Sequence, residues 1–133
     1  MAEKFDLLFK VIIIGDSTVG KTKLLCRYLN KKKIITPTIG VFVVYDVTSE
    51  KSFDSIDGWI KNVKSEFKNE NIVIVLLGNK CDLENERQIT EKQGKKKAID
   101  YGVIFFEVSA ETKKGLKEAF SYMAESILLI KKE

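Results

Sequence analysis

The sequence predicts an α/β fold in which a mostly parallel sheet is flanked by helices on both faces. Two observations favour this fold: short apolar runs recur along the chain, and amphipathic stretches with helical spacing separate them. The runs resemble strands that are buried on both faces of a sheet, and they cover Leu8–Ile14, Val41–Val47, Ile72–Gly78 and Val103–Val108. A chain of 133 residues is expected to form a single domain, here residues 1–133.

A helix is expected after each of these runs. The first covers residues 23–30, and the third opens with a capping box formed by Thr90 and Gln93. The second and fourth helices carry apolar stripes at helical spacing, which we assign to the core. The stripe of the second helix is Phe53, Ile56, Ile60, Val63 and Phe67. The stripe of the fourth is Leu116, Ala119, Phe120, Met123, Ala124, Ile127 and Leu128.

A glycine-containing loop joins the first run to the first helix and reads G-x-x-x-x-G-K-[ST]. Its glycines let backbone N–H groups turn inward, and the helix N-terminus adds partial positive charge, so the loop suits a phosphate group. Lys21 is expected to reach the β- and γ-phosphates, and the Thr22 hydroxyl is expected to bind Mg²⁺. The predicted phosphate-binding residues are Gly15, Asp16, Ser17, Thr18, Val19, Gly20, Lys21 and Thr22. The fold is therefore expected to be that of the P-loop nucleotide-binding proteins.

A second motif, N-K-x-D after the third run, indicates which base is bound. The Asp82 carboxylate is suited to the N1–H and N2–H₂ donors of guanine, whereas adenine would leave this carboxylate unpaired. Asn79 suits the purine N7, and the stem of Lys80 suits the face of the base and ribose. Both motifs stand at the carboxyl ends of strands, where parallel sheets bind ligands. The sequence therefore predicts GTP or GDP, with Mg²⁺, as the ligand.

A third segment, Glu107–Glu111, follows the fourth run. With it, the chain resembles the small GTPases of the Rab family, within the Ras superfamily. The supporting segments are Phe9–Ser17, Pro37–Gly40, Val44–Phe53, Trp59–Ile60, Leu77–Leu83 and Arg87–Ile89. The resemblance implies that Ser109 and Ala110 lie beside guanine and that Thr38 binds Mg²⁺ in the triphosphate state. It also implies vesicle traffic, Rab regulators or effectors as partners, and a cytoplasmic protein whose relatives associate with endomembranes.

The sequence departs from this family between Gly40 and Val41, where the D-T-A-G-Q segment and two strands are missing. The domain is therefore expected to be truncated at the 40/41 junction. The loss removes an Asp that supports Mg²⁺, a Gly at the γ-phosphate and the Gln that orients the attacking water. No catalytic residue is assigned, and impaired hydrolysis and weakened regulator binding are expected. Thr18 and Glu111 also stand where the family usually has Gly and Lys.

The missing segment also predicts an unusual topology. The first helix would make a left-handed crossover to the second strand. The first strand would become a sheet edge through which the protein could self-associate. The domain as a whole is expected to have a low stability. Two alternatives to nucleotide binding remain open: a non-catalytic interaction protein, and an unstable product of a truncated gene model.

The composition narrows the functional classes. The formal net charge is +4, but the lysine clusters at 31–33 and 95–97 have no interleaved aromatic residues, so we expect solvated faces and no nucleic-acid partner. The chain has no histidine, which excludes Ser–His and Cys–His catalysis. Cys26 and Cys81 form no disulfide framework. No apolar run is long enough for a membrane span. A C-terminal Cys, which would indicate a lipid anchor, is not present, so no anchor is expected.

Overall fold

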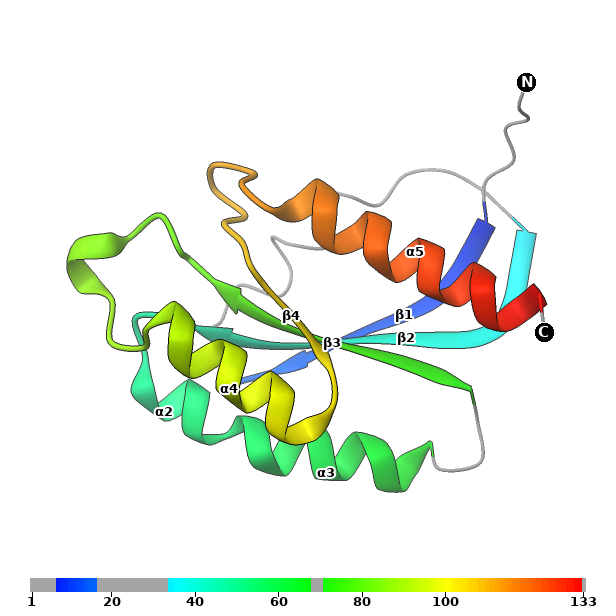
Figure 1. Ribbon diagram of the computed structural model, residues 1–133, viewed down its shortest axis with the longest axis horizontal. Coiled ribbons are helices and arrows are strands. Elements are labelled where there is room, and N and C mark those ends of the chain that lie inside the picture. The colour runs from blue at the N-terminus through cyan, green and yellow to red at the C-terminus, as the bar shows by residue number, and fades with distance from the viewer. Residues whose placement is uncertain (1–6, 17–33, 68–70, 133) are drawn as a thin grey trace.

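The computed structural model describes residues 7–16, 34–67 and 71–132, and for 7–11, 34–39 and 128–132 it describes the backbone (Figure 1). The expected first helix and its crossover, and residues 17–22 of the expected phosphate loop, lie outside the described residues.

The described strands form one parallel sheet in the order β1-β2-β3-β4. The strands are β1 (Leu7–Gly15), β2 (Ile34–Asp46), β3 (Ile72–Asn79) and β4 (Ile104–Glu107). Each predicted apolar run falls on one of them, so the predicted α/β fold with a parallel sheet is confirmed. Among the described strands β1 lies at an edge of the sheet, as expected, and its Ile12, Ile13 and Ile14 side chains are only partly buried.

The second strand differs from its prediction because it begins at Ile34 rather than Val41. Its backbone continues through the 40/41 junction, and Val11 and Ile12 of β1 pair with Gly40 and Val41 of β2 without interruption. The register shifts further back, between Leu8 and Lys10 of β1, opposite the part of β2 that contains Pro37. Proline has no N–H to donate to a neighbouring strand, which accounts for an irregularity at this place. The predicted start of this strand at Val41 is therefore too late by seven residues.

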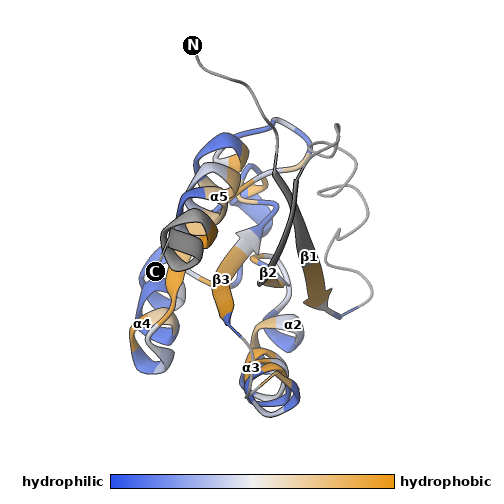
Figure 2. Ribbon diagram, turned by 90° about the vertical axis from the view of Figure 1, so that its right-hand side faces the viewer, coloured by the Kyte–Doolittle hydropathy of each residue, from blue (hydrophilic) through white to orange (hydrophobic). Residues whose placement is uncertain are grey.

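Helices cover the two faces of the sheet (Figure 1). The C-terminal helix α5 (Leu116–Lys132) packs on one face against Phe42, Val44, Val75 and Leu77. The other face carries α2 (Glu50–Asp54), α3 (Ile56–Glu66) and α4 (Glu91–Tyr101), with the short 3₁₀ helix η1 (Glu84–Glu86) preceding α4. Alternate residues of β2 and β3 feed these two cores, because successive strand side chains point to opposite faces. Figure 2 shows the same division by hydropathy: the apolar sides of α3 and α5 face the sheet.

Local sequence signals account for the helix ends. The apolar stripe predicted as one helix is divided at Ser55 into α2 and α3, and Ser49 caps α2 by accepting a hydrogen bond from the N–H of Ser52. The capping box at Thr90 and Gln93 is confirmed at the start of α4. Phe53, Ile56, Ile60 and Val63 are buried as predicted, and so are Leu116, Ala119, Phe120, Met123 and Ile127. None of the helices in the described part of the chain combines the length and apolar character of a membrane-spanning segment.

Candidate functional site: a nucleotide site at the strand ends

The carboxyl ends of the four strands meet along one edge of the sheet. Gly15 of β1 pairs with Val44, two residues before β2 ends at Asp46, and Asp46 pairs with Asn79 at the end of β3. Gly78 pairs with Glu107, the last residue of β4. The start of the phosphate loop, the N-K-x-D motif and the Ser109 segment therefore leave the sheet at the same edge, where parallel sheets bind ligands.

A cavity of about 240 Å³ opens between the second and third of these segments. Its lining contains every residue predicted to contact guanine, together with Leu83 and Glu111. The residues that line it are Asn79, Lys80, Asp82, Leu83, Ser109, Ala110 and Glu111. The structure thus brings together the five predicted residues, which belong to two segments about 30 positions apart in the sequence. That they bind guanine remains a prediction.

Hydrogen bonds hold the two walls of this cavity in place. The side chain of Asn79 is buried, and its Oδ1 accepts the N–H of Ala110 at 3.3 Å. The backbone repeats the link, since the N–H of Cys81 donates to the carbonyl of Val108 at 3.1 Å. Asn79 therefore has a structural role, joining the two walls, beside the expected contact with N7. The N–H of Ala110, which the resemblance places beside guanine, thus already has an acceptor in this structure.

The segment from Ser109 to Gly115 is a closed turn. Ser109 is fully buried; its N–H donates to the Lys114 carbonyl at 3.0 Å, and its Oγ accepts the N–H of Thr112 at 3.0 Å. Lys113 and Gly115 both have positive φ angles, 72° and 75°. Ser109 therefore sets the shape of the wall that presents Ala110, whereas Asp82 is exposed at the rim.

Lys80 is fixed by a residue that sequence reasoning missed. Its backbone has a left-handed φ of 67°, and its Nζ lies 3.0 Å from Oδ2 of Asp46. Asp46 is almost fully buried, and its other oxygen, Oδ1, accepts two hydrogen bonds from Thr48, one from the N–H at 2.8 Å and one from the hydroxyl at 2.6 Å. The available signal was its position: Asp46 is a carboxylate that ends a buried strand between the two motif strands.

Asp16 begins the phosphate loop, but its side chain is held by the neighbouring helix region. Its carboxylate accepts a hydrogen bond from the Ser55 hydroxyl at 3.1 Å and another from the Trp59 indole N–H at 3.2 Å. The part of Asp16 left for phosphate is its backbone. Gly15 before it is buried, and the other predicted phosphate ligands, Ser17 to Thr22, lie outside the described residues.

Thr38 is not brought to this site. It lies in β2 near the register of Leu8 and Lys10, toward the amino end of the sheet, whereas Gly15 pairs with Val44. Six residues of extended chain separate Thr38 from Val44, or about 20 Å. In this structure Thr38 therefore does not fit its expected place as a Mg²⁺ ligand. The reason is the continuous strand: β2 begins at Ile34, and its Ile34, Ile35, Ile39 and Gly40 pair with β1 on either side of Thr38.

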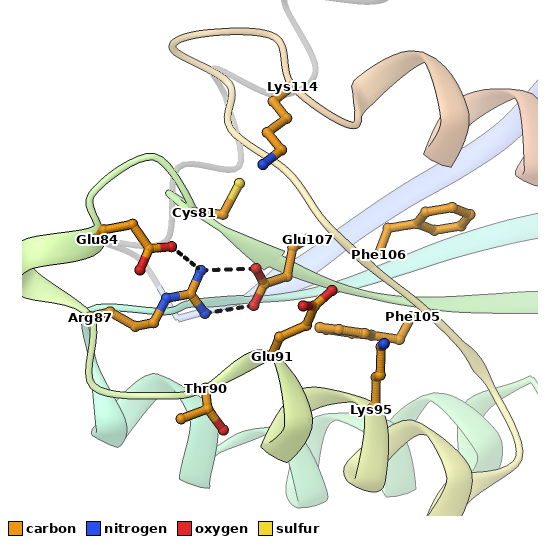
Figure 3. Close-up of a pocket in the computed structure, with 10 residues that line it drawn as sticks. All are labelled: Cys81, Glu84, Arg87, Thr90, Glu91, Lys95, Phe105, Phe106, Glu107 and Lys114. Atoms are coloured by element: carbon orange, nitrogen blue, oxygen red, sulfur yellow. Dashed lines mark hydrogen bonds and ion pairs between the residues drawn. The ribbon is translucent and has the colours of Figure 1, made fainter.

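A larger cavity of about 550 Å³ lies beside β4, between η1, α4 and the Lys114 turn, and none of the predicted site residues lines it (Figure 3). Its central charges are paired with one another. Arg87 donates to both oxygens of Glu107, at 2.7 and 2.9 Å, and to Glu84 at 3.2 Å. Hydrogen bonding to Glu107 holds the pKa of the Arg87 guanidinium above its usual value. This arrangement connects β4 to the segment before α4, so we interpret it as structural.

No group of three or more Cys, Asp or Glu side chains that could hold a metal ion occurs in the described ranges.

Comparison with known proteins agrees with this geometry. The Ras family model matches residues 31–129. The Ras-related protein Rab-8B of Homo sapiens is 36% identical over 171 residues, covering 96% of this chain and 82% of its own. Rab-13 of Bos taurus is 36% identical over 172 residues (97% and 84%), and Rab-8A of Bos taurus is 34% identical over 170 (96% and 82%).

These alignments are longer than the 133-residue chain, so the relatives contain residues with no counterpart in it. That these residues fall at the 40/41 junction remains a prediction. The family implies guanine-nucleotide binding in the context of membrane traffic. A guanine nucleotide is also the ligand that the cavity residues predict. The chain belongs to the Ras family of small GTPases and is similar to Rab-8 and Rab-13.

Proposed function

We propose that this protein binds GDP and GTP at the carboxyl edge of its sheet and that it hydrolyses GTP poorly. The observation that carries the proposal is the cavity of about 240 Å³, because the residues of two separate motifs line it together. Asp82 at its rim would accept the N1–H and N2–H₂ donors of guanine, Asn79 would face N7, and the stem of Lys80 would lie along the base. Ser109 and Ala110 would form the opposite wall.

The phosphates would lie at the end of β1, where the chain enters the phosphate loop. Gly15 and Asp16 would contribute backbone groups, Lys21 would neutralise the β- and γ-phosphates, and Thr22 would bind Mg²⁺. The bound ion would neutralise phosphate charge. Thr38 is left out of this proposal because β2 holds it at the other end of the sheet. We place the protein in the cytoplasm, in contact with Rab regulators or effectors.

The test is a titration of the purified protein with fluorescent GDP and fluorescent ATP, combined with thermal melts. We expect GDP to bind far more tightly than ATP, and the melting temperature to rise with GDP concentration, because a ligand stabilises the state that binds it. Lys21→Ala should weaken binding by about 1.5–3 kcal/mol, the cost of a lost hydrogen bond to a charged group.

Lys92→Ala serves as the matched control, since Lys92 is exposed on α4 and does not line the cavity of the N-K-x-D motif. It removes the same charge and should leave the affinity for GDP unchanged. Equal affinities for ATP and GDP would rule out the proposed function, and so would full GDP affinity in Lys21→Ala.

Hydrolysis is expected to be slower than in intact relatives. Even with the water-orienting Gln present, intrinsic GTPase rates are on the order of 10⁻⁴ s⁻¹. Here the sequence supplies no residue for that role, so we expect little or no phosphate release in a single-turnover assay and no stimulation by Rab-activating proteins. A rate equal to that of human Rab-8B in the same assay would contradict this part of the proposal.

A further inference from the structure

We infer that Asp46 is a positioning residue of the nucleotide site, which fixes the Lys80 ammonium so that the aliphatic stem of Lys80 is held ready to lie against the base. The inference rests on the proposed function. The inference adds a residue on the neighbouring strand, outside the N-K-x-D motif, to the residues of the proposed site. This residue would help to set the affinity for guanine nucleotides.

The first support is the location of Asp46. It is the last residue of β2, it pairs in register with Asn79, and it is 4% exposed. A buried carboxylate is costly unless it is paired and hydrogen-bonded. Asp46 meets this requirement with Thr48 on one oxygen and Lys80 on the other. Lys80 is therefore the positive partner of this buried carboxylate in the structure.

The second support is the state of Lys80. Its backbone is fixed from both sides, because the Asn79 carbonyl accepts the N–H of Val47 at 3.0 Å and the Lys80 carbonyl accepts the N–H of Leu83 at 3.0 Å. Its ammonium is fixed by Asp46. Its side chain is 37% exposed and lines the cavity. With both ends held, a flexible lysine becomes a preorganised surface, which lowers the entropy lost when a ligand packs on it.

The two oxygens of Asp46 have separate tasks, and this allows the positioning role to be distinguished from a structural one. Oδ1 holds the turn through Thr48, whereas Oδ2 faces Lys80. In Asp46→Asn, the amide oxygen would keep the two donors of Thr48, and the amide nitrogen would then face the ammonium of Lys80. This variant removes the Lys80 contact and retains the turn.

The experiment is a double-mutant cycle that measures the affinity and the dissociation rate of fluorescent GDP. The variants are Asp46→Asn, Lys80→Met, which keeps an apolar stem without the ammonium, and their combination. We expect each single variant to weaken binding by about tenfold, mainly through faster dissociation. The double variant should be no weaker than Lys80→Met alone, because Asp46 acts through Lys80.

Thr48→Val is the control for the turn, since it removes the hydroxyl that donates to Oδ1 and leaves the Lys80 pair. It should lower the melting temperature with little change in the affinity for GDP. The preference for GDP over ATP should survive in Asp46→Asn, because Asp82 is untouched. Thermal melts of all variants without nucleotide check that they fold. Lys80→Met breaks the ion pair at its more exposed member, so it should disturb folding less than a change at the buried Asp46.

Additive losses in the double variant would overturn the inference while leaving the proposed function intact. Unchanged GDP affinity in Lys80→Met would overturn it in the same way. If the wild-type protein binds no GDP, both the proposed function and this inference are wrong.

Discussion

Asp82→Asn is expected to weaken GDP binding by about 3 kcal/mol, roughly 100-fold, and to improve the binding of xanthosine diphosphate. The carboxylate of Asp82 would accept two donors on one edge of guanine, and two hydrogen bonds to a charged group account for a loss of this size. An asparagine presents one donor and one acceptor, which matches xanthine, since xanthine has a carbonyl where guanine has its amine. The measurement is competition of GDP, XDP and ADP for the fluorescent GDP complex.

The structure offers a matched control for this exchange. Asp82 is exposed at the rim, so its replacement should not disturb folding, and Glu111 lines the same cavity with the same charge. Glu111→Gln also removes one negative charge from the cavity lining, but it should not change the order of the three nucleotides. Equal losses in the two variants would show that Asp82 acts only as a charge, and the predicted base contact would then be wrong.

Gly115→Ala is expected to destabilise the protein by about 2–4 kcal/mol and to weaken GDP binding as well. Gly115 has a φ of 75°, a left-handed conformation that other residues adopt at a cost. A Cβ at this position would also collide with the backbone carbonyl oxygen of Glu107 and lie 3.2 Å from Cγ1 of Val108. Because backbone cannot rotate away like a side chain, the end of β4 and the Ser109 turn would have to shift.

Two other glycines separate the causes of this loss. Gly102→Ala introduces the left-handed strain alone, since φ is 67° and nothing lies within 4 Å of the added Cβ, so a cost of about 1–2 kcal/mol is expected. Gly58→Ala in α3 meets open space and a helical backbone, and should stabilise by about 0.5–1 kcal/mol. Denaturant unfolding of the three variants measures the series. A Gly115→Ala variant no less stable than Gly102→Ala would contradict the predicted collision.

The sequence predicted the sheet well because each strand is a continuous apolar run that ends at a polar or glycine-containing motif. This pattern also placed the motif residues at one edge of the sheet, since Asn79 is the last residue of β3 and Ser109 follows the end of β4. It fails at residues 34–40, which it does not assign to a strand and where the resemblance places Thr38 at the Mg²⁺ ion. In this chain those residues precede Val41 directly, and the strand extends backward along β1. Pairing with an available neighbour outweighed the local resemblance.

The supporting contacts of the site could not be predicted in the same way. The hydrogen bond between Asn79 and Ala110 joins residues 31 positions apart, and that between Trp59 and Asp16 joins residues 43 apart. Such pairs depend on how helices and turns pack over the strand ends, and no local pattern encodes that. Asp46 lies in the segment Val44–Phe53 that carries the family resemblance, and its pairing with Lys80 follows only from the register of β2 and β3.

The contact between Trp59 and Asp16 gives this protein an optical property. Trp59 is the only tryptophan of the chain, and its indole N–H donates to the residue that follows Gly15. The emission of an indole depends on the charge and hydrogen bonding around it. A ligand that moves the backbone of Asp16 should therefore alter the fluorescence of Trp59, with no label attached. The binding of a ligand at the carboxyl end of β1 could then be followed in real time in the unmodified protein.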